Sequence, residues 1–425
     1  MNHFDLIDDE LACEGVKLTD LAREAGTPVY VYSSATLERH FTVFREALAA
    51  QAGRLGAPLV AYAVKANPNL SVIRTLAGLG AGADTVSEGE IRRALAAGVP
   101  AERIVFSGVG KSDRELAFAL DAGVFQINVE TEPELRRLEA IAAQKGVQAP
   151  VVIRVNPGVG AGGHAKITTG GSDNKFGVSP QIALRLYAEA TRSAALKPLG
   201  LACHLGSQIA DLKPLEDGFA LMRGLVESLR GDGLEVSRLD LGGGLGAPYF
   251  NQPDPPSPQA FAEMAARIAG GLDLQYLFEP GRMIAANAGV LLSRVIAVHA
   301  RPETGRSFLV LDAGMNDLMR PALYEAFHDI RPVTPRAGEL RAYDVVGPIC
   351  ETGDTFARDR MLPPLEAGDL VAFMTAGAYG SSMSNEYNAR PLVPEVLVRG
   401  ERWAVVRRRP TYEEMLAREP LAEWL

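Results

Sequence analysis

The residues best suited to chemistry in this sequence stand at the ends of short apolar segments. Lys65 follows the apolar run 58–64 and precedes Asn67 and Pro68. An amine in such apolar surroundings is more easily deprotonated and becomes nucleophilic. A lysine whose head group reaches out to solvent at a strand end is the alternative, and Lys65 alone does not decide between the two.

Two later motifs can hold an anion. The glycine triplet 242–244 follows one apolar segment, and the sequence EPGR at 279–282 follows the next one. Consecutive glycines let backbone N–H groups approach a phosphate closely. A tight turn without a ligand explains a glycine triplet equally well.

Glu279 and His204 complete the set of reactive side chains. A carboxylate beside a pyridine nitrogen keeps that nitrogen protonated, although a buried glutamate can also pair with a structural arginine. His204 ends another apolar segment, where its ring could stack on a planar cofactor or pack in the core. Ser207 can donate a hydrogen bond to a phosphate. Together with Lys65 as the Schiff-base lysine, these groups predict a site for pyridoxal phosphate.

These groups fall into a regular alternation of strand and helix. Eight apolar segments, each with a helix-like neighbour, occupy residues 60–67, 81–87, 103–108, 124–130, 151–157, 199–208, 238–246 and 274–282. This alternation fits a closed (β/α)8 TIM-like barrel, with an open doubly wound sheet as the alternative. A barrel gathers its strand ends around one mouth, so it is favoured by the polar residues that end most segments, namely Lys65, Ser87, Ser107, Asn128, Asn156, His204 and Glu279.

The regular alternation stops after about residue 282. Later apolar segments are typical of strands without helical partners; they cover 290–300, 307–314, 343–350, 369–380, 394–400 and 401–408. We therefore expect an α/β cofactor-binding barrel over 36–283 and a second, β-rich sandwich- or barrel-like domain over 284–425. An extended segment near residue 30 precedes the barrel, so residues 1–35 are expected to join the second domain.

Composition and charge exclude several classes of partner. The formal net charge of −9 argues against binding of nucleic acid, and no apolar run reaches membrane-spanning length. The acidic N-terminus lacks the order of a signal peptide, and three widely spaced cysteines, Cys13, Cys203 and Cys350, suit a reducing compartment. We expect a cytoplasmic protein with no membrane partner and no metal site.

The motifs, taken in order, resemble those of a known enzyme family. AVKAN, HLGSQ, GGG and EPGR are similar to the motifs of the fold-type III, alanine-racemase-like barrel decarboxylases, which depend on pyridoxal 5′-phosphate. The resemblance narrows to the diaminopimelate decarboxylases when three later motifs are added, DAGMNDLMRPALYEAFH at 312–328, CETGD at 350–354 and GAYG at 377–380. It covers nearly the whole chain.

This resemblance implies a role for each matching residue. Lys65 would carry the cofactor, Glu279 would hold its ring nitrogen and His204 would stack on the ring. The remaining cofactor contacts would come from Ser207, Gly243, Gly244, Gly281, Arg282 and Tyr379. The substrate would be bound by Arg282, Arg320, Tyr324, Glu351 and Tyr379. Diaminopimelate has a carboxylate and an ammonium group at its far end, which Arg320 and Glu351 can bind.

Two interpretations of the role of Cys350 are open. A free cysteine at the end of an apolar run is usually a small buried hydrophobic residue. The resemblance instead makes Cys350 the catalytic acid that returns a proton after carbon dioxide leaves. It also implies that Cys350 and Glu351 reach the site of a second subunit, so that the active unit is a homodimer.

The implied reaction is decarboxylation of meso-2,6-diaminopimelate at its D-centre, which gives L-lysine and carbon dioxide in lysine biosynthesis. Alanine racemase places an arginine beside the ring nitrogen, so Glu279 argues against it, and Arg320 argues against ornithine or arginine decarboxylase. A decarboxylase of a D-configured or carrier-bound amino acid stays open. A non-catalytic protein that binds pyridoxal phosphate would lack the second domain.

A glycine-rich connection at 156–179 follows the fifth barrel strand. Long polar loops of this kind are often lids, so we expect it to cover the barrel mouth. His164, Lys166 and Lys175 are further candidates for substrate contact, with exposed loop residues as the alternative.

Overall fold

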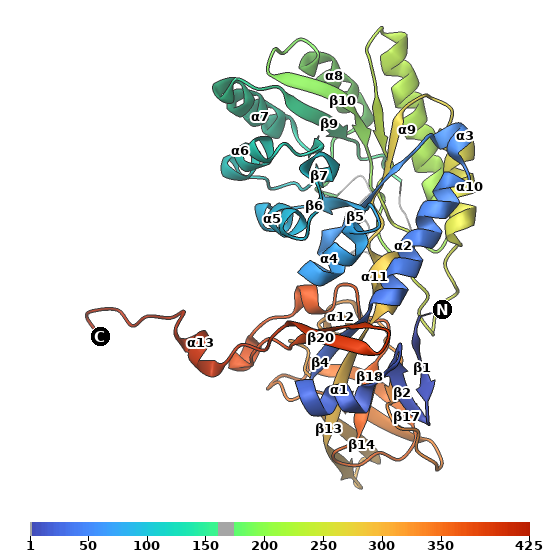
Figure 1. The fold of residues 1–425 in the computed structure, drawn as a ribbon, viewed down its shortest axis with the longest axis vertical. Helices are drawn as coiled ribbons and strands as arrows, with labels where there is room; N and C mark the ends of the chain where they lie inside the picture. Colours follow the sequence, from blue (N-terminus) through green and yellow to red (C-terminus); the bar gives the residue numbers. More distant parts are fainter. Residues whose placement is uncertain (1, 160–173) are drawn as a thin grey trace. The chain divides into compact units, whose positions relative to one another are not determined.

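The computed structural model describes residues 2–159 and 174–425, and these divide into two compact units (Figure 1). The barrel unit comprises Glu38–Pro248 and Pro253–Ile284. The β-rich unit comprises Met1–Leu37, Tyr249–Gln252 and Ala285–Leu425. Each unit is built from segments that are separated in the sequence.

Parallel strands form a closed barrel, as predicted. Within the described ranges eight strands take part, in the order β10-β11-β12-β5-β6-β7-β8-β9. The pairing of β12 with β5 closes the ring, which excludes the open doubly wound sheet. Their bounds are β5 (Leu59–Ala63), β6 (Gly82–Thr85), β7 (Ile104–Phe106), β8 (Gln126–Val129), β9 (Ala149–Arg154), β10 (Leu196–Ala202), β11 (Arg238–Asp240) and β12 (Gln275–Phe278).

Helices alternate with these strands, and several of them begin at a residue whose side chain caps the helix. Ser112 and Glu115 form a reciprocal capping box at the start of α6, and Gly123 ends that helix in the left-handed conformation. The helices are α2 (Ser34–Ala49), α3 (Ala52–Leu55), α4 (Leu70–Ala77), α5 (Glu88–Ala96), α6 (Asp113–Ala122), α7 (Glu132–Lys145), α8 (Pro180–Ala190), α9 (Lys213–Gly231), α10 (Pro258–Ala269) and α11 (Arg282–Ala285), with 3-10 turns η1 (Val64–Ala66) and η2 (Ala101–Arg103).

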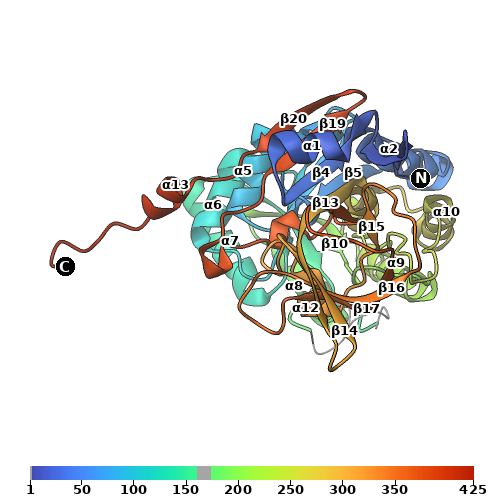
Figure 2. The same cartoon turned by 90° about the horizontal axis from the view of Figure 1, so that it is seen from below.

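The β-rich unit is organised around the long strand β13. In the described part of this unit the main sheet has nine strands; β13 pairs with β14, β18 and β4, and Figure 2 shows β14, β16 and β17 at one side. The strands are β4 (Val29–Ser33), β13 (Gly289–Arg301), β14 (Arg306–Leu311), β15 (Ile330–Pro332), β16 (Arg341–Val346), β17 (Thr355–Leu362), β18 (Leu370–Phe373), β19 (Glu395–Arg399) and β20 (Arg402–Arg407). The prediction of a β-rich region is confirmed.

Short helices lie between the strands of this unit. They are α1 (Leu18–Ala25), α12 (Arg320–Tyr324) and α13 (Tyr412–Leu416), with 3-10 turns η4 (Ala286–Ala288), η5 (Ser381–Met383) and η6 (Tyr387–Ala389). The C-terminal segment with α13 extends away from the sheet (Figure 1).

Some strands of this unit were not predicted. The N-terminal strands β1 (Phe4–Ile7), β2 (Glu10–Cys13) and β3 (Val16–Lys17) form a small antiparallel sheet, and β17 was also missed. The turns between the N-terminal strands place Asp8, Asp9 and Glu14 at positive φ, so acidic residues stand where glycine usually marks a turn. The N-terminus therefore shows a run of acidic residues rather than a hairpin signal.

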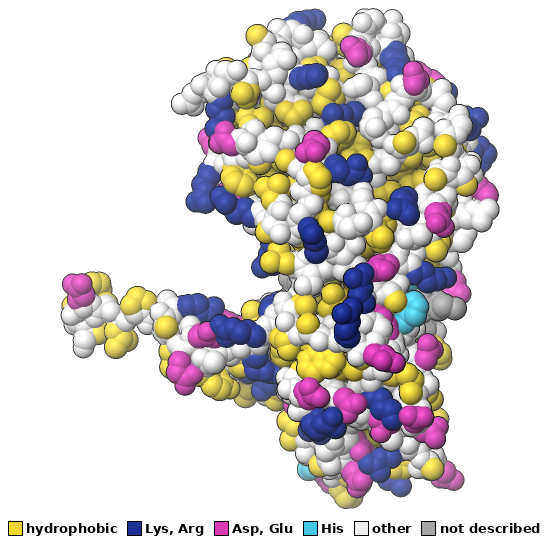
Figure 3. Space-filling model, in the orientation of Figure 1, with side chains coloured by type: hydrophobic (Ala, Val, Ile, Leu, Met, Phe, Trp, Pro, Cys, Tyr) yellow, Lys and Arg dark blue, Asp and Glu magenta, His cyan; other side chains and the backbone are white. Residues whose placement is uncertain are grey.

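Charges are mixed over the surface. On the face shown in Figure 3, basic and acidic side chains are interspersed. None of the helices in the described part of the chain combines the length and apolar character that a membrane crossing needs.

Candidate active site

The residues predicted to bind the cofactor follow neighbouring strands of the barrel unit. In barrel order, β10 is followed by His204 and Ser207, β11 by the glycine triplet, β12 by Glu279 and Arg282, and β5 by Lys65. Parallel strands of a barrel end on the same side, so the closure of the barrel places these distant parts of the sequence along one arc of its rim.

Lys65 lies in η1, directly after β5, and is held by a carboxylate. Its amine donates to Asp84 Oδ2 at 2.5 Å, and Asp84 is fully buried in β6. The Lys65 side chain remains 34% exposed, so the amine is oriented and still accessible. Asp84 was not predicted as a site residue, because an aspartate inside an apolar segment does not show by itself which residue it will pair with.

Glu279 and Asp240 are two buried carboxyl groups that influence each other's ionisation. Burial raises the pKa of Glu279 well above its ordinary value, and the negative charges of Asp240 and Asp84 raise this pKa further, against the opposing effect of Lys65. Burial also raises the pKa of Asp240. Both shifts favour the protonated form of a carboxyl group. Among the described residues, the buried Oε1 atom of Glu279 has no hydrogen-bond partner.

Side chains inside the barrel hold Asp240 in place. Gln126 Nε2 and Asn128 Nδ2 each donate to Asp240 Oδ2 at 3.2 Å, and the Gly242 amide donates to Oδ1 at 3.0 Å. Asn128 was predicted at the barrel mouth, but it binds Asp240 within the barrel. Ser87 was also predicted there, and it instead caps the N-terminus of α5.

The glycine triplet packs against the adjacent strand ends. The Gly243 amide donates to His204 Nδ1 at 3.2 Å, and a Cβ atom on Gly243 would lie 2.2 Å from the Glu279 carbonyl oxygen. Burial lowers the pKa of His204 well below its ordinary value, and the charges of Lys65 and Arg154 lower it further. His204 is therefore a neutral, flat ring whose Nδ1 lone pair faces the glycine loop.

Arg282 brings a positive charge to the same side of the barrel. It is largely buried, and its Nε donates to Ser207 Oγ at 3.0 Å. The neighbouring Gly281 is tightly packed, since a Cβ atom there would lie 2.9 Å from Ala63 Cβ. This hydrogen bond links the segment that follows β10, with Ser207, to the segment that follows β12, with Arg282.

The chemistry of this set fits a planar anionic cofactor with a basic ring nitrogen. Lys65 offers an amine, Arg282 and the close-packed glycine loop suit an anion, and His204 offers a neutral ring. The unpartnered Oε1 of Glu279 is the kind of buried acceptor that a protonated ring nitrogen satisfies.

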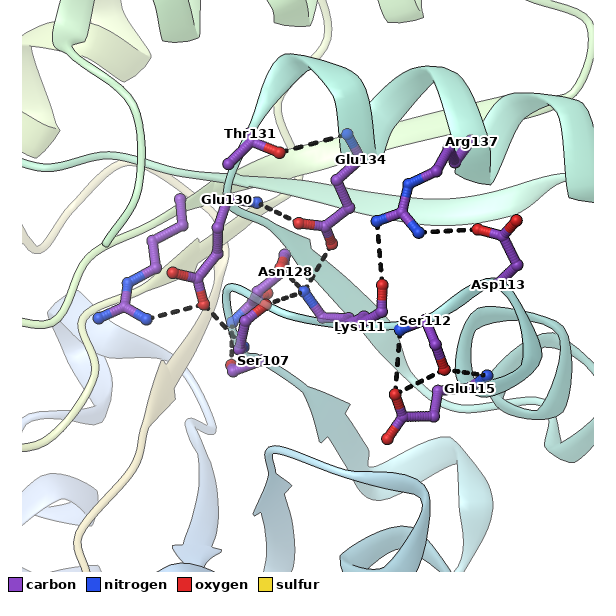
Figure 4. Close-up of polar contacts among 12 residues, drawn as sticks. Ser107, Lys111, Ser112, Asp113, Glu115, Asn128, Glu130, Thr131, Glu134 and Arg137 are labelled. Carbon is purple, nitrogen blue, oxygen red and sulfur yellow. Dashed lines mark hydrogen bonds and ion pairs between the residues drawn. The ribbon is translucent and has the colours of Figure 1, made fainter. Parts of the chain in front are cut away.

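A buried ion network supports the neighbouring part of the barrel (Figure 4). The Lys111 amine donates to Glu134 Oε1 at 2.6 Å and to the carbonyl oxygens of Gly108 and Asn128 at 2.7 Å each. All three N–H bonds are used, and both side chains of the pair are almost fully buried. Burial lowers the pKa of Lys111 and raises that of Glu134, and each partner opposes the shift of the other.

This network extends to Arg154 at the end of β9. Glu134 Oε2 accepts from the backbone N–H of Glu130, whose own Oε1 accepts from Arg154 Nη1 at 2.9 Å. The Arg154 charge contributes to the low pKa of His204. This connection was not predicted, because a lone lysine in a GKS loop usually indicates a solvent-exposed residue.

The residues predicted to bind the far end of the substrate lie in the β-rich unit. Arg320 begins α12 and is 7% exposed, with its guanidinium carbon 5.3 Å from the centre of the Tyr249 ring. Tyr324 ends the same short helix and is partly buried. Burial of this guanidinium distinguishes Arg320 from an arginine in a surface ion pair.

Cys350 and Glu351 lie at the surface of this unit. Glu351 Oε2 accepts from the Tyr387 hydroxyl at 3.2 Å, and the Cys350 amide donates to Asn388 Oδ1 at 3.1 Å. The Cys350 side chain is exposed, whereas Cys13 and Cys203 are buried. The reading of Cys350 as a small buried hydrophobic residue is therefore wrong.

Tyr379 stands in an unusual backbone conformation. Its φ is 56°, in the left-handed region that residues other than glycine seldom adopt. The neighbouring Gly377 approaches the chain closely, since a Cβ atom there would lie 2.1 Å from the Ala285 carbonyl oxygen. The GAYG motif thus holds a strained turn, as is common at binding sites.

Two of the further candidates, His164 and Lys166, lie outside the described residues. The third, Lys175, has its amine 5.4 Å from the centre of the Phe176 ring. Among the described residues, no cluster of histidine, cysteine, aspartate or glutamate has the composition of a metal site.

Comparison with known proteins identifies the class that this fold and site define. A family model described as "Pyridoxal-dependent decarboxylase, pyridoxal binding domain" matches residues 34–286. This range includes the barrel strands and every residue of the arc from His204 to Lys65.

Relatives that match both units narrow the class. Proteins named diaminopimelate decarboxylase from Zymomonas mobilis and Pseudomonas aeruginosa are 47% and 48% identical, and each alignment covers 99% of both chains. The structure of diaminopimelate decarboxylase from M. jannaschii in complex with L-lysine has a TM-score of 0.94 at 34% identity, over 100% of both chains. The chain belongs to the diaminopimelate decarboxylase family, which confirms the resemblance seen in its motifs.

Proposed function

We propose that this chain uses pyridoxal 5′-phosphate to decarboxylate meso-2,6-diaminopimelate at its D-centre, giving L-lysine and carbon dioxide. The observation that carries the proposal is the contiguous arc formed by Lys65, Glu279, the glycine triplet and Arg282 at the end of the barrel strands. Membership of the diaminopimelate decarboxylases, over the full length of both units, supports this substrate.

Each residue of the arc has a proposed role toward the cofactor. Bound pyridoxal phosphate supplies a protonated ring that accepts the electron pair released with carbon dioxide. Lys65 would hold the cofactor through its amine, and Asp84 orients that amine by accepting its hydrogen bond. Glu279 would bind the protonated ring nitrogen through its buried Oε1 atom and so favour the charged ring. His204 packs on the ring face as a neutral imidazole.

The phosphate is assigned to the other residues of the arc. Arg282 supplies a cation, and Ser207 and the backbone of Gly243, Gly244 and Gly281 supply close-packed hydrogen-bonding groups. Tyr379 of the GAYG turn is proposed to contact both cofactor and substrate.

The far end of the substrate carries one carboxylate and one ammonium group. We assign the carboxylate to Arg320, whose planar guanidinium can bind it through two parallel hydrogen bonds, and the ammonium to Glu351. Tyr324 and Arg282 complete the proposed substrate contacts. Ornithine lacks the far carboxylate, so a buried arginine favours diaminopimelate over that alternative.

Substrate selection tests the proposal directly. The protein loaded with pyridoxal phosphate is expected to release carbon dioxide from meso-diaminopimelate and much more slowly from L-ornithine, L-arginine or D-lysine. Arg320→Ala is expected to lower kcat/KM for diaminopimelate by about 10²-fold, because a charged hydrogen-bonding partner is lost, and to leave cofactor absorbance unchanged. Release from ornithine alone, or loss of cofactor in Arg320→Ala, would contradict the assignment.

We further propose a homodimer in which Cys350 and Glu351 act at the partner's site, with Cys350 as the acid that returns a proton. Both residues stand at the surface of the β-rich unit. The C-terminal segment also exposes Leu421, Trp424 and Leu425 at 85%, 86% and 91%, apolar surface that a second copy can cover.

Mixing two inactive variants tests shared sites. Lys65→Ala and Cys350→Ala are each expected to be nearly inactive alone. After dissociation and reassembly of an equal mixture, about a quarter of wild-type activity should return, because about half of the dimers are mixed and each of these has one intact site. If no activity returns although mixed dimers form, Cys350 does not act across an interface.

Two coarser assignments complete the proposal. We place the protein in the cytoplasm, which cell fractionation can check. We also keep 36–283 as the cofactor-binding domain and 284–425 with 1–35 as the second domain. Limited proteolysis followed by mass spectrometry should find cleavage near 35 or 284 if these boundaries are correct.

A further inference from the structure

Arg320 is held by a histidine to which no role has been assigned above. The guanidinium Nη1 lies 3.0 Å from Nε2 of His328, eight residues further along the chain, and both side chains are buried. An arginine is fully protonated and only donates hydrogen bonds, so His328 Nε2 must accept through its lone pair. Two cations would otherwise face each other.

The other ring nitrogen of His328 fixes the same tautomer. Nδ1 lies 2.9 Å from the backbone carbonyl oxygen of Met374, at the end of β18. A carbonyl oxygen only accepts, so Nδ1 carries the proton. Both hydrogen bonds are satisfied only by a neutral imidazole with its proton on Nδ1.

An aromatic ring completes the support. Tyr249 packs edge-on against His328, with ring centres 6.1 Å apart and an interplanar angle of 83°, and its face lies beneath the Arg320 guanidinium. Tyr249 comes from the short segment Tyr249–Gln252 that joins the β-rich unit. The guanidinium is therefore held at one edge by His328 and on one face by Tyr249.

We infer that His328 is a specificity-determining positioning residue: with Tyr249, it fixes the orientation of the Arg320 guanidinium that binds the carboxylate at the far end of the substrate. This inference rests on the proposed role of Arg320. A flexible arginine would lose side-chain entropy on binding, whereas a guanidinium already held in one plane binds a carboxylate with less loss.

A pair of ligands isolates this effect. L-Lysine, the proposed product, keeps the far carboxylate, and cadaverine is the same diamine without it. Isothermal titration calorimetry of the loaded protein gives a Kd for each. The ratio of these Kd values reports the carboxylate contact, and a general loss of structure would weaken both ligands instead.

Two substitutions of His328 separate its hydrogen bonds. His328→Asn keeps a donor near the Met374 carbonyl and removes the acceptor for Arg320, whereas His328→Gln can place an oxygen near the position of Nε2. His328→Asn is expected to weaken L-lysine binding by about 10-fold or more, with cadaverine nearly unchanged. His328→Gln should restore most of the difference. Equal weakening of both ligands, or no change in either, would overturn the inference.

Further variants keep the test decisive. If His328→Asn does not fold, Tyr249→Leu removes the ring beneath the guanidinium and should shift the same ratio, while Tyr249→Phe should not. An unchanged ratio in Tyr249→Leu would then overturn the inference. Arg320→Lys serves as the reference. If the ratio of the two Kd values changes in Arg320→Lys but not in His328→Asn, the inferred role of His328 is wrong and that of Arg320 stands. If the ratio does not change in Arg320→Lys, the proposed role of Arg320 is wrong.

Discussion

Glu279→Gln is expected to lower the rate of decarboxylation by about 10²–10³-fold and, at the same time, to stabilise the cofactor-free chain near neutral pH. The rate falls because an amide cannot hold a positive charge at the ring nitrogen, which removes one preorganised electrostatic interaction. The Glu279 side chain thus accelerates the proposed reaction and lowers the stability of the cofactor-free protein near neutral pH.

The sign of the stability effect follows from the raised pKa of Glu279. In the unfolded chain this carboxyl group ionises near 4.5, whereas burial, Asp240 and Asp84 keep it protonated to higher pH in the folded chain. The protonated group favours folding at low pH, and this contribution is lost as pH rises from 4.5 through the raised pKa. Glutamine does not titrate, so the advantage of Glu279→Gln should be small below pH 4.5 and grow above it.

Thermal unfolding of the cofactor-free protein, measured below pH 4.5 and near neutral pH, checks this expectation. Glu235→Gln is the matched control, because Glu235 is exposed and should change stability little at any pH. A Glu279→Gln variant with wild-type turnover, or with the same relative stability at both pH values, would show that Glu279 does not act as described.

Lys111→Met is expected to destabilise the fold by about 3–5 kcal/mol, because it leaves the buried Glu134 without its cation. Two carbonyl oxygens also lose their donor, those of Gly108 and Asn128. Lys111 lowers the pKa of Glu134, so that pKa should rise further in the variant. The loss of stability should therefore be larger near neutral pH than in acid.

Urea unfolding with a double variant and a surface control tests this prediction. In Lys111→Met/Glu134→Gln the buried charge is gone and the amide can donate to a vacated carbonyl, so part of the stability should return. Lys145→Met removes a lysine whose ion pair with Asp121 has a similar length, 2.7 Å, but is partly exposed. It should change stability by less than about 1 kcal/mol. Equal effects of the two lysine substitutions would contradict a structural role for the buried network.

The alternation of segments predicted the barrel correctly because its strands are short and mostly apolar, and several are followed by helices that begin at a capping residue. Strand β5, for example, is buried at every position, and its apolar residues show this in the sequence. The N-terminal strands β1 to β3 give no such signal, because their turns are built from acidic residues and they form few pairs. The apolar pattern of the sequence therefore predicts the strands of the barrel but does not predict those of the N-terminal sheet.

The candidate site divides in the same way. Lys65, Glu279 and the glycine triplet stand in motifs at segment ends, so they could be selected by type and position. Asp84 and Asp240 lie inside their segments, where a lone aspartate indicates no partner until the barrel closes around it. His328 is the last residue of the motif at 312–328. Its positioning role depends on hydrogen bonds to Arg320 Nη1 and to the Met374 carbonyl oxygen, and the spacing of these residues in the sequence does not predict those contacts.

From the sequence alone came the succession of the barrel strands, the chemical groups at their ends and the family. These follow from residue type and short-range spacing, which act within a few residues of chain. The tertiary structure was needed to show which carboxyl groups are buried side by side, which tautomer His328 adopts and how Lys111 is buried. Those properties depend on low-dielectric surroundings and on hydrogen bonds between distant segments, and both arise only when the barrel has closed and the β-rich sheet has formed.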